Sequence, residues 1–271
     1  MNLTKSQIKK FQTDIYAYYK EHGRDLPWRK TTDPYRILIS EIMLQQTQVP
    51  RVVPAYERFI TVFPDIRSLA DVDLRSILRE WKGLGYNRRA KMLKDMAAEI
   101  VARFDGVIPP DEATLRSLPG IGPYTANAVR AFAFNLPAVF IETNIRSVFI
   151  HFFFKDSAGV KDSEILPLVA QTLDTDNPRE WYYALMDYGV FLKQTGENPS
   201  RSSAHYTKQS RFQGSDRQIR GKILELLLEH ENLTETELCA RFDSDPERTK
   251  NIIARLVKEG ILVNDRYLSI A

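Results

Sequence analysis

The sequence contains very little cysteine and few histidines. Only one cysteine, Cys239, occurs among 271 residues, and the four histidines are scattered. A single cysteine excludes an internal disulfide and any zinc or iron–sulfur site built on cysteine. No two histidines have the spacing of a metal site, and His151, which lies in an apolar run, is expected to be a core residue. The sequence therefore predicts no bound transition metal.

Long apolar runs are also missing. No stretch approaches the roughly 18 apolar residues that a membrane-spanning helix needs, and residues 1–20 are too polar for a secretory signal. The net charge of +3 is weak evidence for a polyanionic partner. With 43% apolar residues and a length of 271, the chain is expected to be globular, cytoplasmic and large enough for two to three modest domains.

Helical periodicity dominates the first 195 residues and includes a glycine turn between two short helices, predicted over 111–118 and 124–134. Gly120 and Gly122 permit backbone angles and close approaches that a Cβ would forbid. Free amides at the start of the second helix would suit a phosphate. Taken alone, the turn favours the simpler interpretation, an interhelical turn without a ligand.

A carboxylate lies on an otherwise apolar helix predicted over residues 35–48. Glu41 shares one stripe of this helix with Ile37, Gln45 and Gln48. The stripe is either the solvated face of the helix or a partly buried polar site. In the second case, desolvation would raise the pKa of Glu41 and suit it to donate a proton near neutral pH.

Two further segments allow a structural and a functional interpretation. Residues 83–91 form a glycine turn with Tyr86 followed by three cations, which indicates either a nucleic-acid contact or a helix cap with a solvated first turn. Glu142 lies between apolar runs, with Asn144 two residues later. It is either a helix N-cap or an active-site acid, and the pattern alone favours the cap.

The last part of the chain differs from the first. Residues 194–215 form a polar connector, and the basic segment 201–222 contains interleaved aromatics. This segment is either a DNA-backbone contact or an ordinary solvated linker. The sequence pattern of residues 216–271 predicts three helices and a β-hairpin, an arrangement typical of a small winged-helix-like domain. The third helix presents several cations, so it could contact DNA, contact a protein or serve as a structural cap.

These segments together resemble a known family. Five motifs follow one another between about residues 10 and 193: Leu26-Pro27-Trp28-Arg29, Pro34-Tyr35, Ser40-Glu41-Ile42-Met43-Leu44-Gln45-Gln46-Thr47-Gln48-Val49, Gly83-Leu84-Gly85-Tyr86 and Leu118-Pro119-Gly120-Ile121-Gly122-Pro123-Tyr124-Thr125-Ala126. They resemble the helix-hairpin-helix (HhH-GPD) superfamily of DNA glycosylases, and within it the adenine DNA glycosylases of the MutY type. The resemblance implies an all-α fold with two helical subdomains, 1–26 plus 134–193 and 27–133. A basic linker, 194–215, and the winged-helix-like α+β domain, 216–271, follow.

The implied activity is base-excision repair of double-stranded DNA that contains a mismatch or a damaged base. Such enzymes flip the target nucleotide into a pocket, because the glycosidic bond cannot be reached in the stack. Adenine opposite guanine or 8-oxoguanine is the leading substrate, and thymine or uracil in a guanine mismatch, or a damaged purine, is the alternative. A DNA-structure-binding protein with weak catalysis is a further alternative. We expect a monomer associated with the nucleoid, without an iron–sulfur cluster. The resemblance also allows a monovalent cation at the hairpin.

The resemblance assigns roles by position. Glu41 matches the glutamate that protonates the base, Tyr124 the catalytic tyrosine, and Asn144 an active-site asparagine. Tyrosine at position 124, where lyase relatives have a Schiff-base lysine, implies hydrolysis without strand cleavage. Residues expected to line the base pocket are Trp28, Arg29, Leu44, Tyr183 and Met186. Residues expected to contact DNA are Gln46, Thr47, Gln48, Tyr86, Arg88, Arg89, Gly120, Gly122, Thr125, Arg201, Lys208 and Arg211.

The sequence departs from the family pattern at four places. Glu142 stands where the family has an aspartate that stabilises the cationic sugar, and the extra methylene shifts the carboxylate by roughly 1 Å. Tyr183 stands where a glutamate of the adenine pocket is expected. Lys193 replaces the first cluster cysteine, and the other three are missing. We also expect the C-terminal domain that reads 8-oxoguanine to be replaced by the winged-helix-like domain. The reaction type is therefore better supported by the sequence than the identity of the base.

Overall fold

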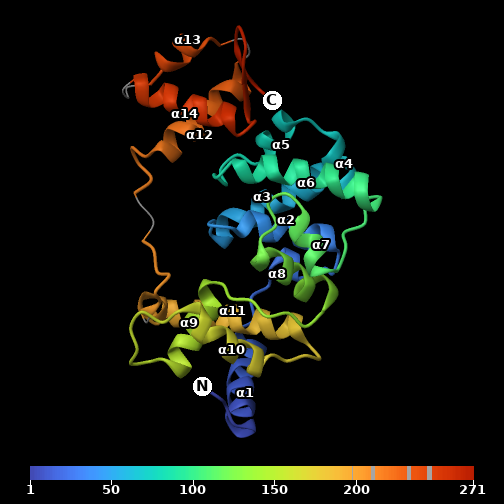
Figure 1. Cartoon of the computed structure of the whole chain (residues 1–271), viewed down its shortest axis with the longest axis vertical. Helices are drawn as coiled ribbons and strands as arrows, with labels where there is room; N and C mark the ends of the chain where they lie inside the picture. Colours follow the sequence, from blue (N-terminus) through green and yellow to red (C-terminus); the bar gives the residue numbers. More distant parts are fainter. Residues whose placement is uncertain (197, 209–210, 231–232, 243–245) are drawn as a thin grey trace. The chain divides into compact units, whose positions relative to one another are not determined.

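The computed structural model describes residues 1–196, 198–208, 211–230, 233–242 and 246–271. It is mostly helical (Figure 1) and divides into two compact units. The first contains residues 1–41, 109–117 and 121–208, and the second contains 42–108, 118–120 and 209–271. These bounds differ from those of the expected subdomains, because residues 27–41, 109–117 and 121–133 group with the first unit and residues 209–271 group with the second. Within the described ranges, no helix is long and apolar enough to cross a membrane.

The first unit is built around one long helix, α11. Its helices are α1 (Lys5–His22), η1 (Pro27–Arg29), most of α2 (Pro34–Leu44), α7 (Glu112–Ser117), α8 (Pro123–Phe134), α9 (Thr143–Phe153), α10 (Asp162–Thr172), α11 (Pro178–Gln194) and η2 (Pro199–Ser202). Trp181 of α11 is fully buried, and Phe11 of α1 lies edge-on to it with ring centroids 5.7 Å apart. Phe11 also lies edge-on to Phe149 of α9 at 5.4 Å, so aromatic packing joins the three helices.

A glycine allows α9 and α11 to lie unusually close together (Figure 1). A Cβ added at Gly189 of α11 would lie 2.4 Å from the carbonyl oxygen of Asn144 and 2.6 Å from its Cβ. No side chain fits in that space, so Gly189 fixes the position of Asn144. Gly189 was not predicted from the sequence, although a glycine inside an aromatic-rich helix indicates such a close approach.

The second unit begins at the end of α2 and continues with α3 (Val49–Val62), α4 (Ile66–Asp71), α5 (Leu74–Glu80) and α6 (Arg88–Phe104). Its C-terminal part contains α12 (Asp216–Glu229), α13 (Glu235–Cys239), α14 (Pro246–Lys258) and two short strands, β1 (Leu262–Asn264) and β2 (Leu268–Ile270). The strands are antiparallel, with Leu262 opposite Ile270. Three helices and a hairpin were expected here, and the prediction is confirmed.

Helix α2 is shorter than expected. It ends at Leu44 rather than at Gln48, because Gln46 adopts a left-handed backbone conformation with φ 54°. Pro50 lies in the first turn of α3, where its missing N–H has no helical partner to lose, so it begins that helix rather than ending α2. The predicted polar stripe is therefore wrong. Ile37 and Glu41 are 2% and 5% exposed, and Gln45 and Gln48 lie outside the helix.

A buried ion-pair network ties α11 to the segment before α2. Asp187 is 3% exposed and accepts hydrogen bonds from the backbone N–H of Arg24 at 2.8 Å and from its Nε at 2.6 Å. Both terminal nitrogens of Arg29 donate to the same carboxylate at 2.8 Å. Burial alone would raise the pKa of Asp187, but the two arginines hold it below its usual range. Neither Arg24 nor Asp187 was predicted from the sequence.

We expect Asp187→Asn to destabilise the protein by about 3–5 kcal/mol at pH 7, because it leaves a buried guanidinium without its counter-charge. Because the pKa of Asp187 is lowered, its ion pairs stabilise the folded protein fully at pH values above the ordinary pKa of aspartate. This stabilisation is lost as the pH falls through the lower pKa of the folded state. The difference in free energy of unfolding between the two proteins should therefore shrink below about pH 4. Urea denaturation at several pH values measures it.

Asp25→Asn is the matched control, because Asp25 pairs with Lys30 on the surface, where both side chains are more than half exposed. A difference between the two variants of less than 1 kcal/mol at pH 7 would contradict this account of Asp187.

Candidate active site

Glu41 is a buried carboxyl group near the end of α2. Its Oε2 accepts a hydrogen bond from the Tyr124 hydroxyl at 2.9 Å. Burial raises the pKa of Glu41 to about 7, the tyrosine opposes this shift, and the nearby Glu142 adds to it. The ambiguity of the sequence pattern is thereby resolved in favour of the buried site. Glu41 has the properties of a proton donor near neutral pH.

Tyr124 lies in the first turn of α8, where Pro123 opens the helix. Its ring packs edge-on against Phe140 with centroids 5.6 Å apart. Burial, together with the charges of Glu41 and Glu142, raises the pKa of Tyr124 well above its ordinary value. The hydroxyl therefore stays protonated and donates to Glu41.

Glu142 is the N-cap of α9 as well as a buried carboxyl group. Its Oε1 accepts hydrogen bonds from the backbone N–H groups of Asn144 at 2.7 Å and Ile145 at 2.8 Å. Its Oε2 accepts from Asn144 Nδ2 at 3.1 Å. Burial raises the pKa of Glu142, whereas the two backbone donors and Lys193 oppose the rise. The sequence left a cap and an active-site acid as alternatives, and the structure is compatible with both at once.

Lys193 completes a chain of hydrogen bonds that the sequence did not predict. Its Nζ donates to Asn144 Oδ1 at 2.7 Å, which leaves the Nδ2 of the same amide to donate to Glu142. Burial lowers the pKa of Lys193, and the charge of Glu142 opposes that shift. The lysine at the expected cysteine position therefore fixes the orientation of Asn144 and puts a positive charge near Glu142.

Among the residues expected to line the base pocket, Arg29 and Tyr183 contact each other. The guanidinium of Arg29 lies 4.5 Å from the centre of the Tyr183 ring, a cation–π contact. Tyr183 in turn stacks on Phe132 with centroids 4.6 Å apart. Trp28 is buried beside Arg29 in η1, and Met186 is half-buried on α11. Leu44 is half-buried at the end of α2 and belongs to the second unit.

Only one of the two hairpin glycines has the backbone conformation that the sequence predicts, because Gly122 has φ −88°, which any residue can adopt. Gly120 has φ 77°, and a Cβ there would lie 3.0 Å from the Cβ of Met92. Gly122 is the N-cap of α8, with open space where a Cβ would be. Thr125 is 2% exposed, which differs from the exposed DNA contact that we expected.

Five of the residues expected to contact DNA from the second unit are at least partly exposed, as DNA contacts require: Gln46, Thr47, Gln48, Tyr86 and Arg88.

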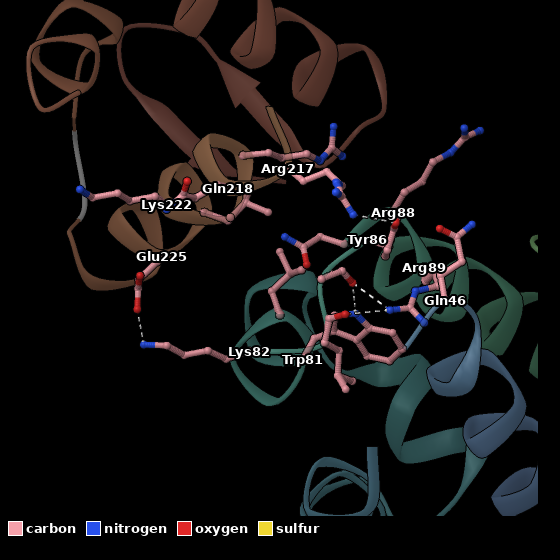
Figure 2. A pocket seen from close by; sticks show the side chains of 18 of the residues that line it. Gln46, Trp81, Lys82, Tyr86, Arg88, Arg89, Arg217, Gln218, Lys222 and Glu225 are labelled. Atoms are coloured by element: carbon pink, nitrogen blue, oxygen red, sulfur yellow. Dashed lines mark hydrogen bonds and ion pairs between the residues drawn. The ribbon is translucent and has the colours of Figure 1, made fainter. Parts of the chain in front are cut away.

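Arg89, which was also expected to contact DNA, differs, since it is 8% exposed. Its guanidinium joins the loop after α2 to the loop before α6 (Figure 2) and lies 5.3 Å from the Trp81 ring. Burial lowers the pKa of Arg89 to about 10, so it remains charged at neutral pH. Its six acceptors, at 2.6–3.1 Å, are the carbonyl oxygens of Ile42, Met43, Gln45, Leu84 and Gly85 and the hydroxyl of Thr47.

The three cations expected to contact DNA from the linker are all exposed. Arg201 lies in η2 and, like Lys208, belongs to the first unit, whereas Arg211 belongs to the second. The linker also includes Glu197, Gln209 and Ser210, which lie outside the described residues.

The residues at the expected cluster position do not fit an iron–sulfur cluster. Such clusters are held by several cysteine thiolates. The one cysteine, Cys239, lies in α13 of the second unit, and Lys193 binds Asn144 instead of a metal.

Comparison with known proteins identifies the family. The family described as HhH-GPD superfamily base excision DNA repair protein matches residues 39–166. An adenine DNA glycosylase of Mycolicibacterium smegmatis is 33% identical over 268 residues, which cover 92% of this chain and 91% of that protein. A thymine/uracil-DNA glycosylase of Pyrobaculum aerophilum is 32% identical over 191 residues, covering 66% of this chain and 81% of that protein.

A solved structure of a thermostable thymine-DNA glycosylase is also similar, with a TM-score of 0.63 and 27% identity over 70% of this chain and 88% of that one. The mycobacterial relative matches this chain over nearly its whole length, including the C-terminal domain. The chain therefore belongs to the HhH-GPD superfamily of base excision DNA repair proteins and is a DNA glycosylase.

Proposed function

We propose that this glycosylase is monofunctional and removes adenine mispaired with guanine or 8-oxoguanine in duplex DNA, acting as a monomer. The observation that carries the proposal is the hydrogen bond between Glu41 and Tyr124 beside the buried carboxylate Glu142. It supplies an acid, a neutral hydroxyl and an anion, which is the set that base hydrolysis requires. The match to the mycobacterial adenine DNA glycosylase supports adenine as the base.

The reaction has two steps. Protonated Glu41 gives its proton to the departing base while the bond between the base nitrogen and C1′ breaks, and its electron pair goes to the base. Glu142, held as an anion by the N-terminus of α9, stabilises the positive charge that develops on the sugar. Water then adds to C1′ and gives a proton to Glu41, which restores the starting acid.

A second candidate is removal of thymine or uracil from a guanine mismatch. It is favoured by the relative from Pyrobaculum aerophilum and by Tyr183, which stands where the adenine pocket is expected to have a glutamate. We further propose that the protein works without an iron–sulfur cluster, and that the hairpin can take a monovalent cation. Iron measured on the purified protein tests the first of these two statements.

Duplexes that differ in only one base pair separate the two substrates. We expect release of adenine opposite guanine and 8-oxoguanine under single-turnover conditions, and no release of thymine or uracil. Glu41→Gln should lower the rate by at least roughly a hundredfold, because the proton donor is lost. Release of thymine alone would contradict the adenine assignment, and equal rates for Glu41→Gln and wild type would contradict the mechanism.

The pH dependence follows from the same groups. The rate should fall as the pH rises through about 7, because Glu41 is then deprotonated and cannot protonate the base. At acid pH the rate should fall as Glu142 becomes neutral. The two limbs of the rate–pH profile report apparent pKa values of the coupled Glu41–Glu142 pair and not of either residue alone. A rate that is flat between pH 6 and about 9 would contradict Glu41 as the acid.

The monofunctional assignment predicts no covalent adduct with DNA after borohydride treatment, because position 124 carries a hydroxyl and no amine. Lys193 is the one amine in the hydrogen-bond chain around Glu142, and its bond to Asn144 holds it in a positioning role. An adduct that forms with wild type and is lost in Lys193→Met would contradict both statements.

Lys193→Met should lower the single-turnover rate on the order of tenfold, because Asn144 loses the donor that orients it. It should also move the acid limb of the pH profile upward, since Lys193 lowers the pKa of Glu142. Lys193→Arg keeps the charge and a donor and should retain more activity than the methionine variant. An unchanged acid limb in Lys193→Met would show that the lysine has only a packing role.

A further inference from the structure

The second unit contains a cavity of about 1180 Å³ between the loops around the Arg89 guanidinium and helix α12. The turn after α2 and the loop before α6 form one side, and Phe212 with α12 forms the other. Figure 2 shows Arg217 and Gln218 of α12 on one side and Tyr86 and Arg88 on the other. Glu41, Tyr124 and Glu142 are not among the residues that line this cavity.

The cavity is strongly basic. Seven of its lining residues are arginine or lysine, and only two are glutamate. Both glutamates already have partners, since Glu225 pairs with Lys82 and Glu259 with Arg220. The remaining cations leave a net positive surface, which attracts phosphate.

Aromatic rings are interleaved with these cations. Phe212 is 60% exposed, which is unusual for such a large apolar side chain. Arg217 lies 6.0 Å from the centre of this ring, and its Nη1 donates to the Tyr86 hydroxyl at 3.2 Å. Alternating guanidinium and aromatic groups suit nucleic acid, because phosphates bind the cations and bases stack on the rings.

Two loops present strained residues to this cavity. Gln46 and Tyr86 have φ values of 54° and 47°, in the left-handed region that few non-glycine residues adopt. The Arg89 guanidinium holds the backbone next to both residues, since it binds the carbonyl oxygen of Gln45 just before Gln46 and those of Leu84 and Gly85 just before Tyr86. Strain that persists in this way is concentrated at ligand-binding positions.

Helix α14 is the usual candidate for DNA contact in a winged helix, but three of its cations have acidic partners. Arg248 and Arg255 pair with Asp216, and Lys250 pairs with Glu247. Helix α12 instead directs Arg217 and Lys222 to the cavity.

We propose that α12 of the C-terminal domain forms one wall of a DNA-binding groove, in which Arg217 and Lys222 bind the phosphate backbone of the substrate duplex and Tyr86 and Phe212 contact its bases. The proposal rests on the glycosylase assignment and not on which base is removed. It gives the C-terminal domain a direct part in holding DNA.

The test uses the full-length protein and a duplex that contains a single tetrahydrofuran abasic site, which binds without being cleaved. The variant is Arg217→Gln combined with Lys222→Gln. The dissociation constant should rise on the order of tenfold, and the slope of log affinity against log salt should flatten by about 1 to 2, because up to two phosphate contacts are lost. Melting temperatures verify that both proteins are folded.

Lys250→Gln combined with Lys258→Gln removes the same charge from α14 and is the matched control. Gln218→Glu is a second probe, since Gln218 Oε1 accepts a hydrogen bond from the N–H of Gly214 and glutamate keeps that acceptor while adding a negative charge in the groove. We expect Gln218→Glu to weaken binding and the α14 control to leave the salt slope unchanged. An unchanged slope in the α12 variant, or an equal loss in the control, would overturn the proposal. If wild type binds the abasic-site duplex but releases no adenine from the mispaired duplexes, the proposed substrate fails and the groove stands.

Discussion

The burial of two carboxyl groups in one unit is the constraint on which the proposed catalytic site depends. A carboxylate without partners in an apolar interior takes up a proton. Glu41 and Glu142 lie near each other, yet they have different partners. Glu41 accepts a hydrogen bond from the neutral Tyr124 hydroxyl and lies near Arg29, whereas Glu142 has two backbone N–H donors, the Asn144 amide and a nearby lysine. Burial raises the pKa of both groups, and the extra donors of Glu142 oppose the rise there. In the proposed reaction this difference assigns the acid to Glu41 and the anion to Glu142.

The supporting residues reach this site from several helices. Gly189 lets the backbone of α9 approach α11, Lys193 fixes the Asn144 amide, and the Asp187 network holds Arg29 over Tyr183. In the second unit, Arg89 holds the two loops that line the basic cavity by donating hydrogen bonds to carbonyl oxygens of both. In both units a charged side chain, Lys193 in the first and Arg89 in the second, forms hydrogen bonds to amide or backbone groups and so positions the neighbouring functional residues.

The sequence predicted the helical fold, the hairpin and the residues Glu41, Tyr124 and Glu142, because each of these has a local pattern or a family motif. It did not predict Asp187, Gly189 or the role of Lys193, since their partners lie far away in the sequence. Arg89 shows the limit most clearly. A cation after a glycine turn has the same local pattern whether it faces phosphate or backbone carbonyls, and only the fold shows that it is buried.

The position of Glu142 at the start of α9 has a consequence for how this chain can change over time. A residue that serves only in catalysis can be lost freely once its reaction is no longer selected. Removing this carboxylate, however, also removes the N-cap of a core helix, a change that typically costs about 1 kcal/mol of folding stability. Aspartate is both an acid and a good cap, so exchange between aspartate and glutamate keeps a carboxylate for both roles while moving it by roughly 1 Å, whereas apolar replacements preserve neither. Selection for a stable helix therefore helps to retain the charge even while the substrate preference drifts.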